Sequence, residues 1–287
     1  MTEFILVTGA TGKTGRRVAA ALRARGVGVR LAARRPQTAD AVEFDWLREE
    51  TWRPALDGVT GVYLLAPQAT PEMIAAMIAF CQAATASEPR RLVLLSASLL
   101  PRGGPAHGQV HAWLADHAPA WAVLRPSWFM QNFSEGPHRA TILAENAVYS
   151  ATADGRVGFV SADDIAACAA ACLTADAPPN RDAILTGPRA IAYDEAAAII
   201  AQASGRSVVH RRISVEDLAA RHVAQGLPPA AAQGLAMMDA AIAAGLEDRV
   251  TDEVTALTGR PPIAFEDFAR AEAGAWTTAA RAERHPA

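Results

Sequence analysis

The residues best suited to chemistry lie in a glycine loop near the start of the chain. Residues 7–15 read VTGATGKTG, in which Gly9, Gly12 and Gly15 form the pattern G-x-x-G-x-x-G between an apolar run and a helical pattern. Glycines at this spacing let the backbone turn tightly and approach a pyrophosphate, and the next helix supplies N–H donors from its N-terminus. The loop therefore predicts a dinucleotide site, with a glycine-rich turn that binds nothing as the alternative. The expected contacts are Gly9, Ala10, Thr11, Gly12, Lys13, Thr14 and Gly15.

The residues after the second apolar run indicate which dinucleotide is bound. Residues 32–36 read AARRP, and the first acidic side chain after them is Asp40. A site for NAD has an acidic side chain here that accepts from the ribose. Arg34, with Arg35 and Lys13, is instead suited to neutralise a 2′-phosphate by charge-assisted hydrogen bonds. We therefore expect NADP(H) to be preferred over NAD(H), although Arg35 alone equally fits a solvated loop cation.

Asp45 ends the third apolar run, in the stretch EFDW at 43–46. In one interpretation it contacts the adenine amino group of the cofactor. In the other it is the N-cap of a helical segment at 47–55, because aspartate is a favoured capping residue.

Apolar runs and helical patterns alternate along the first half of the chain. The runs are continuous rather than alternating in polarity, which is typical of strands covered on both faces of a parallel sheet. The runs lie at 4–8, 27–33, 42–45, 62–66, 92–96 and 121–125, and the helical patterns at 14–25, 71–86 and 107–117. This alternation predicts an α/β fold, a Rossmann-type doubly wound parallel sheet.

The chain after about residue 190 is mostly helical in pattern, with one strand-like run at 208–213. The helical segments are 193–204, 215–225, 229–245 and 265–278. We therefore expect an NAD(P)-binding Rossmann domain at 1–150. The last Rossmann elements and a smaller, mainly helical C-terminal substrate or cap lobe are expected at 151–287.

In a doubly wound sheet, ligands bind at the carboxyl edge of the strands. The loops at Gly9 and Arg34 would hold the adenosine half, so the loops after the next three central strands are expected to flank the nicotinamide. The residues expected to line the cofactor there are Ala66, Pro67, Gln68, Ser96, Pro126 and Trp128. The expected substrate contacts are Trp128, Phe129, Met130 and Asn132. Core packing is the alternative for Phe129, whereas a buried amide such as Gln131 or Asn132 needs polar partners.

Several stretches together resemble a known family. They are the glycine loop, Arg34, LVLLS at 92–96, LRPSWFMQNF at 124–133, FVSADDIA at 159–166, TGRPP at 258–262 and FEDF at 265–268. This set, which spans nearly the whole chain, looks like the NmrA-like branch of the atypical short-chain dehydrogenase/reductases. Within that branch the chain is similar to NAD(P)H-dependent quinone reductases and to ergot-alkaloid-type dehydrogenases. The resemblance implies hydride transfer between a nicotinamide cofactor and a small organic acceptor.

The chain departs from the wider superfamily at the proton donor. That superfamily uses Tyr-x-x-x-Lys, but Lys13 is the only lysine here and no tyrosine has a lysine four residues on. The corresponding segment, 103–113, reads GGPAHGQVHAW, and the resemblance puts His107 at the lysine position. A neutral imidazole both donates and accepts near pH 7. His107 is therefore expected to relay a proton or contact the ribose, with a purely structural histidine as the alternative.

His111 stands four residues after His107, on the same helix face. Zinc enzymes use this spacing too, but no glutamate lies between the two histidines and no third ligand is evident, so no metal is expected. The predicted catalytic residues are His107, Ser96 and Asn132, with His111 among the substrate contacts.

The predicted pocket is apolar and aromatic with few polar groups, which suits a flat hydrophobic acceptor. Hydride transfer mainly requires an electrophilic carbon held beside the nicotinamide. A quinone, an imine or iminium, an enone or a carbonyl therefore fits, with a histidine or water as the proton source. Two alternatives stay open: an NADP(H)-binding redox sensor or regulatory protein without turnover, and a non-redox isomerase or lyase on the same scaffold.

Composition bears on the other classes of protein. The 287 residues are 51% hydrophobic with a formal net charge of −3, which provides no basic field for nucleic acid or anionic membranes. No apolar run reaches the roughly 18–20 residues of a membrane span, and the first residues do not resemble a secretory signal. We expect a cytoplasmic monomer or homodimer with a small-molecule partner. Cys81, Cys168 and Cys172 are expected to be buried free thiols, with a metal pair or redox couple as the alternative.

Overall fold

The computed structural model describes residues 4–67, 69–86, 88 and 90–277, which form two compact units. Within these residues, the first unit is made of the segments 4–127, 162–186 and 251–262. The second unit is made of 128–161, 187–250 and 263–277. The chain therefore leaves the first unit after Ser127 and returns to it twice.

The first unit is built on a seven-stranded sheet in the order β3-β2-β1-β4-β5-β6-β9, in which every neighbouring pair is parallel. The strands are β1 (Phe4–Val7), β2 (Gly28–Ala33), β3 (Ala41–Glu43), β4 (Gly61–Leu64), β5 (Arg91–Leu95), β6 (Trp121–Pro126) and β9 (Arg181–Leu185). The chain order reverses on either side of β1, which is the switch point of a doubly wound fold. The predicted Rossmann-type sheet is confirmed.

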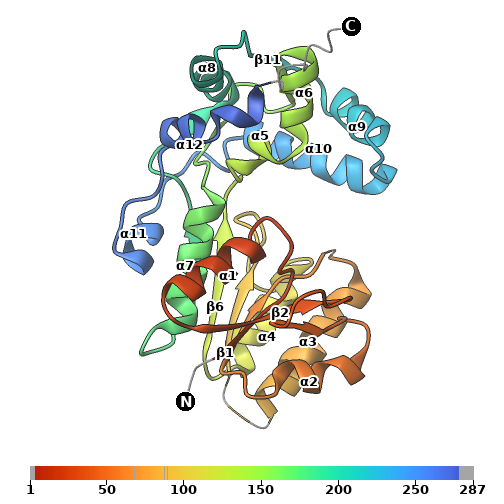
Figure 1. Cartoon of the computed structure of the whole chain (residues 1–287). Coiled ribbons are helices and arrows are strands. Elements are labelled where there is room, and N and C mark those ends of the chain that lie inside the picture. Colours follow the sequence, from red (N-terminus) through yellow and green to blue (C-terminus); the bar gives the residue numbers. More distant parts are fainter. Residues whose placement is uncertain (1–3, 68, 87, 89, 278–287) are drawn as a thin grey trace, which may run out of the picture. The chain divides into compact units, whose positions relative to one another are not determined.

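Helices cover both faces of this sheet (Figure 1). One face carries α1 (Gly15–Ala24) and α7 (Ala162–Thr174), which pack on each other, with α11 (Glu253–Thr258) beside α7. The other face carries α2 (Trp52–Leu56), α3 (Pro71–Ala86) and α4 (His107–His117), and a short 3-10 turn (Glu49–Thr51) precedes α2.

The central strands are mostly apolar because both faces of the sheet are covered. Val62 and Leu64 of β4 are fully buried in the core beneath α3, together with Phe80 of that helix. Gly61 points to the other face, where a Cβ would lie 3.3 Å from Leu173 Cδ2 of α7. Alternate residues of one strand therefore serve two separate cores, and a continuous apolar run results.

The second unit is mainly helical and has two small sheets. β7 (Ala147–Ser150) pairs in parallel with β11 (Val209–Arg212), and β8 (Arg156–Val157) pairs antiparallel with β10 (Ile191–Ala192). The helices are α5 (Gln131–Ser134), α6 (Pro137–Glu145), α8 (Tyr193–Ser204), α9 (Val215–Ala224), α10 (Pro229–Ala243) and α12 (Phe265–Ala271), followed by a 3-10 turn (Ala273–Trp276). The strand expected at 208–213 and the helical character of the later chain are confirmed.

Aromatic rings form the core of the second unit. The ring centroid of Phe133 lies 5.3 Å from that of Phe159 and 5.3 Å from that of Phe265, edge to face in both cases. Trp276 is fully buried, and its Nε1 donates to the carbonyl oxygen of Phe133 at 2.7 Å. Such ring pairs stabilise a core beyond their buried area, and they tie α5 and α12 together.

The three cysteines are free and buried, as predicted. Burial raises the pKa of the Cys172 thiol to about 11 and raises the pKa of Cys81 and of Cys168 further, so all three are protonated at neutral pH. Among the described residues, no group of three or more His, Cys, Asp or Glu side chains is arranged to hold a metal ion. None of the described helices is long and apolar enough to cross a bilayer.

Asp239 of α10 makes the stability of the second unit depend on pH. Its Oδ2 accepts from the backbone N–H of Ala151 at 2.9 Å, and burial raises its pKa from an ordinary 3.8 to about 6. Because the folded-state pKa lies above the unfolded value, the folded protein holds this proton more tightly. The resulting stabilisation, about 3 kcal/mol, is lost as the pH rises from about 4 to about 6.

We therefore expect Asp239→Asn, whose amide oxygen can still accept from Ala151, to be more stable than the wild type at pH 8. The advantage should shrink toward pH 4, where the wild-type carboxyl is protonated. Urea unfolding of both proteins between pH 4 and pH 8 measures the difference. A difference that does not change with pH would contradict the proposed burial of the charge.

Candidate functional site

The glycine loop folds back on itself between β1 and α1. Gly12 N donates to Gly9 O at 2.9 Å, and Gly9 has a φ of +61°, a conformation that favours glycine. A Cβ on Gly15, the first residue of α1, would lie 2.2 Å from Gly9 O, so no side chain fits there. Thr8 Oγ1 donates to Tyr63 O at 2.8 Å and so anchors the loop to β4. The backbone therefore forms the narrow cradle that a pyrophosphate requires.

The N-terminus of α1 faces this cradle. Thr14, the residue before the helix, is buried but makes no side-chain capping hydrogen bond, and the first turn has no acidic residue. The position that a capping oxygen would take is the one in which helix N-termini bind phosphate. Arg17 of this helix donates to Lys13 O at 2.9 Å and pairs with Asp163 of α7 at 3.0 Å. Of the other loop residues, Ala10 is buried and Thr11 is exposed.

Arg34 and Arg35 follow β2 directly, at the carboxyl edge of the strand beside β1. Both are exposed, and neither forms an ion pair within the part of the chain that the structure describes. Asp40, the first acidic residue after them, is paired with Arg23. The edge that would meet the adenosine ribose is therefore basic and has no free carboxylate from this segment.

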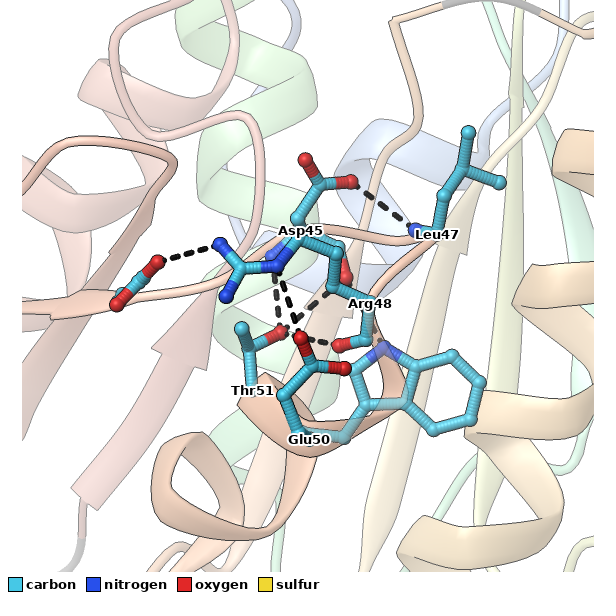
Figure 2. A network of polar contacts seen from close by, with 7 residues as sticks. Asp45, Leu47, Arg48, Glu50 and Thr51 are labelled. Atoms are coloured by element: carbon cyan, nitrogen blue, oxygen red, sulfur yellow. Dashed lines mark hydrogen bonds and ion pairs between the residues drawn. The ribbon is translucent and has the colours of Figure 1, made fainter.

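Asp45 organises the turn after β3 (Figure 2). Its Oδ1 accepts from Leu47 N at 3.0 Å, and its backbone N–H donates to Thr51 Oγ1 at 3.0 Å. Trp52 Nε1 donates to Asp45 O at 3.1 Å. The helix begins only at Trp52, with Thr51 as its N-cap, so the prediction that Asp45 caps a helix at 47–55 is wrong. The carboxylate instead closes a two-residue turn at the sheet edge.

The strands on the other side of the switch point end in small residues. Ala66, Pro126 and Ser98 are buried at this edge, Pro67 is exposed, and the predicted contact Gln68 lies outside the described residues. Ser96 follows β5, and its backbone N–H donates to Leu124 O at 2.8 Å. The Oγ of Ser96 is buried and has no hydrogen-bond partner among the described residues. A buried hydroxyl without a partner is uncommon and calls for a ligand or water.

His107 begins α4, which follows β5 and therefore starts at the same carboxyl edge. Its Nε2 is buried and has no partner within the described chain. Burial lowers the pKa of its imidazole, so His107 is neutral at pH 7 and keeps one donor and one acceptor nitrogen. A Cβ on Gly108 would lie 2.5 Å from Pro101 O, so this glycine lets the loop of residues 101–107 pack against the first turn.

His111 lies one turn further along α4 and is buried, with its ring centroid 5.8 Å from that of Trp121. Burial lowers the pKa of His111, while the charge of Asp182 opposes that shift. Asp182 is paired with Arg125 at 2.7 Å, and Arg125 also donates to Ser98 O at 2.7 Å. His111 thus sits next to the first residue of β6, in a partly charged environment, and its role as a substrate contact stays a prediction.

The other residues predicted to contact substrate belong to the second unit. The segment 128–130 runs beside Val160: Val160 N donates to Trp128 O at 2.9 Å, and Met130 N donates to Val160 O at 3.0 Å. Phe129 and Asn132 are partly exposed, whereas Met130 is 1% exposed. Gln131 is buried, and its Nε2 donates to Ser161 Oγ at 3.2 Å, which supplies the partner that a buried amide needs.

The structure also gives a structural role to two stretches of the family resemblance, FVSADDIA at 159–166 and TGRPP at 258–262. Asp164 of α7 is fully buried and pairs with Arg260 at 2.9 Å. The acidic motif at 163–164 therefore joins α7 both to α1, through Arg17, and to the segment after α11.

Comparison with known proteins identifies the family. The sequence model of a family described as NAD(P)H-binding matches residues 9–176, more than half of the chain. The chain belongs to this NAD(P)H-binding family. It is 40% identical to an uncharacterised oxidoreductase, YesF, of Bacillus subtilis, over 96% of each protein. It is 38% identical to the agroclavine dehydrogenase of Claviceps purpurea, over 95% of this chain and 98% of that protein.

Among solved structures, the fold resembles that of the NADPH-dependent quinone oxidoreductase QOR2 of Escherichia coli in complex with NADPH. The TM-score is 0.78 at 23% identity, over 92% of this chain and 98% of that one. Together these relatives make the chain an NAD(P)H-binding oxidoreductase, in agreement with the predicted NmrA-like branch of the atypical short-chain dehydrogenase/reductases.

Proposed function

We propose that this protein transfers hydride from NADPH to a small apolar acceptor: a quinone, an imine or iminium, an enone or a carbonyl. The proposal is carried by two buried polar atoms, Ser96 Oγ and His107 Nε2, which have no hydrogen-bond partner among the residues that the structure describes. Both lie at the carboxyl edge of the sheet that also carries the glycine loop. The curated relatives support the reaction class, because one is an agroclavine dehydrogenase and one solved neighbour is a quinone oxidoreductase.

The residues of the first unit fit the cofactor. The cradle around Gly9 would hold the pyrophosphate, Arg34 and Arg35 the 2′-phosphate, and Asp45 the adenine amino group. Bound NADPH supplies the hydride. Ala66, Pro67, Gln68, Ser96 and Pro126, together with Trp128, the first residue of the second unit, are proposed to line the nicotinamide half.

Protonation distinguishes the candidate acceptors. Reduction of a quinone, enone or carbonyl adds a hydride to carbon and a proton to oxygen or carbon, whereas reduction of an iminium needs the hydride alone. Neutral His107 is proposed to relay that proton, taking one up from water at one ring nitrogen as the other ring nitrogen donates, and Ser96 to hold the oxygen that receives it. Trp128, Phe129, Met130, Asn132 and His111 are proposed to contact the acceptor.

The test follows NADPH oxidation at 340 nm with a panel of quinones, enones and cyclic iminium ions. We expect His107→Ala to lower kcat for quinones and enones by about 100-fold, the usual contribution of a positioned general acid, and to leave iminium reduction within about threefold of the wild type. His117→Ala, at the exposed end of the same helix, is the matched control. Equal losses on all acceptors would contradict proton donation by His107. NADPH binding without turnover of any acceptor would indicate a sensor.

We further propose that Arg34 sets the preference for NADPH. Arg34→Gln removes a cation that a 2′-phosphate would pair with, so we expect a loss of NADPH affinity of about 10- to 100-fold, the range of a charge-assisted hydrogen bond, with NADH affinity unchanged. Titration calorimetry with both cofactors measures the two effects, and Arg211→Gln, an exposed arginine of β11, is the control. An equal loss for both cofactors would place Arg34 elsewhere than at the 2′-phosphate.

A further inference from the structure

The chain that follows β5 stays hydrogen-bonded to β6 after the strand has ended. Ser96 N donates to Leu124 O at 2.8 Å, and Ser98 N donates to Pro126 O at 2.9 Å. Residues 96–98 therefore continue the line of β5 beside the end of β6. They lie at the carboxyl edge of the sheet, where a doubly wound fold binds its ligands.

The side chain of Arg125, in β6, holds the same segment. Its Nη2 donates to Ser98 O at 2.7 Å, and its Nη1 donates to Asp182 Oδ2 of β9 at 2.7 Å. Asp182 is paired with Val123, two residues before Arg125, so the side chains of Arg125 and Asp182 point to the same face of the sheet. Since β6 lies between β5 and β9, one guanidinium connects the edge strand to the segment after β5. The backbone N–H and the carbonyl of Ser98 are thus both held by the last two residues of β6.

The stability of the sheet does not explain why an arginine stands at position 125. Its side chain is 13% exposed, and its Nε is buried without a hydrogen-bond partner among the described residues. Burying a cation is costly, an unpaired donor adds to that cost, and even a complete buried ion pair is weak evidence for stability. An apolar side chain of similar size would avoid these costs, but it could not hold Ser98 O. The arginine is therefore better explained by the placement of this segment.

We propose that Arg125 is a positioning residue: by holding Ser98 O, it fixes Ser96 Oγ in the place from which the hydroxyl contacts the oxygen of the acceptor. The inference rests on the proposed function, which gives Ser96 that contact. Ser96 Oγ has no hydrogen-bond partner of its own among the described residues, so its placement depends on the backbone that carries it. Asp182 orients the guanidinium from the other side.

A double-mutant cycle with Arg125→Lys and Ser96→Ala tests whether Arg125 acts through Ser96. Lysine keeps the charge beside Asp182 but lacks the planar fork that reaches two acceptors at once. We expect Arg125→Lys to lower kcat for 1,4-benzoquinone about tenfold with KM for NADPH within about twofold, because a small displacement of a positioned group slows the reaction. In the Ser96→Ala background the same substitution should change kcat less than about twofold, because residues that act through one another are not additive.

The matched control is Arg102→Lys, which alters an exposed arginine of the same unit that pairs with Asp116. It should leave kcat within about twofold of the wild type in both backgrounds. If Arg125→Lys has no effect, or if its loss simply adds to that of Ser96→Ala, the inference is wrong while the proposed function stands. If Ser96→Ala alone keeps the wild-type kcat, the proposed contact of Ser96 fails and the inference fails with it.

Hydrogen exchange, measured by NMR without any ligand, reads the segment independently of turnover. We expect the amide of Ser98 to exchange about tenfold faster in Arg125→Lys, with the amides of β1 unchanged, because the loss of the side-chain contact favours local opening. If Arg125→Lys does not fold, Asp182→Asn takes its place, with an expected change of about threefold in both kcat and exchange. If no acceptor oxidises NADPH, the proposed function fails and exchange alone decides: an unchanged rate at Ser98 would overturn the positioning role of Arg125.

Discussion

Replacing Gly12 with alanine should leave the protein folded and remove most of its affinity for NADPH, whereas replacing Gly15 with alanine should destabilise the fold itself. A Cβ on Gly15 would lie 2.2 Å from Gly9 O and 2.7 Å from Gly9 C, two backbone atoms that cannot move without opening the loop. We expect Gly15→Ala to cost about 3 kcal/mol or more, the upper range for overpacking.

Gly12 is in a different position, because its Cβ would meet only Gly9 O, at 3.1 Å, a contact relieved by a shift of a few tenths of an ångström. The protein alone therefore gives little reason for glycine there. The close approach of a pyrophosphate gives a stronger one. We expect Gly12→Ala to weaken NADPH binding about 10- to 100-fold. This loss corresponds to about 1.4–2.7 kcal/mol of binding free energy, which is the usual cost of one overpacked contact.

Thermal unfolding and NADPH calorimetry on the two variants separate these effects. Gly234→Ala is the control, because nothing lies within 4 Å of a Cβ on this helical glycine of α10. It should bind NADPH as the wild type does and gain about 0.5–1 kcal/mol of stability from the helix. If Gly12→Ala binds NADPH with wild-type affinity, the nucleotide does not approach this part of the loop. If it unfolds as Gly15→Ala does, loop shape alone explains the glycine.

The central strands could be predicted from the sequence because burial on both faces leaves a continuous apolar run. The runs at 4–8, 92–96 and 121–125 correspond to β1, β5 and β6 within a residue or two. β9 (Arg181–Leu185) was not predicted, and its position explains why: it is an edge strand with a charged start, and only Ala183 and Leu185 are buried. A strand that alternates over five residues has too weak a pattern to stand out.

Parts of the candidate site that are continuous in sequence could be located from the sequence alone. Parts that form only when distant segments pack together could not. The glycine loop and the arginines after β2 are recognisable because residue type and spacing suffice. Within the second unit, Met130, Phe159, Ile191 and Phe265 line one pocket although they come from four distant segments, and only the fold brings them together. The stretch FEDF at 265–268 contributes to the family resemblance. Its residue types alone do not indicate that Phe265 lines a pocket. The turn made by Asp45 likewise depends on Thr51 and Trp52, and residue types alone left a helix cap and an adenine contact equally open.

Arg90 is the clearest residue whose importance only the structure reveals. Its side chain is almost fully buried, and its guanidinium donates to three backbone carbonyls: Nε to Val59 O at 2.9 Å, and its two terminal nitrogens to Ala84 O at 2.8 Å and Leu56 O at 3.1 Å. Leu56 ends α2 and Ala84 lies in the last turn of α3, where carbonyls lack partners within the helix. One side chain thus satisfies the ends of two helices and the turn before β4.

Replacing Arg90 with methionine keeps much of the side-chain volume and removes every donor, so three buried carbonyls lose a charged partner together. We expect a loss of about 3–5 kcal/mol in the free energy of unfolding, comparable to breaking a buried ionic contact. Arg91→Met is the matched control, because among the described residues the side chain of Arg91 donates to one carbonyl, Leu173 O at 2.9 Å. The loss of that hydrogen bond should cost about 1 kcal/mol. Urea unfolding of the two variants decides the matter: equal losses would mean that volume, and not the three shared carbonyls, explains why an arginine is buried at position 90.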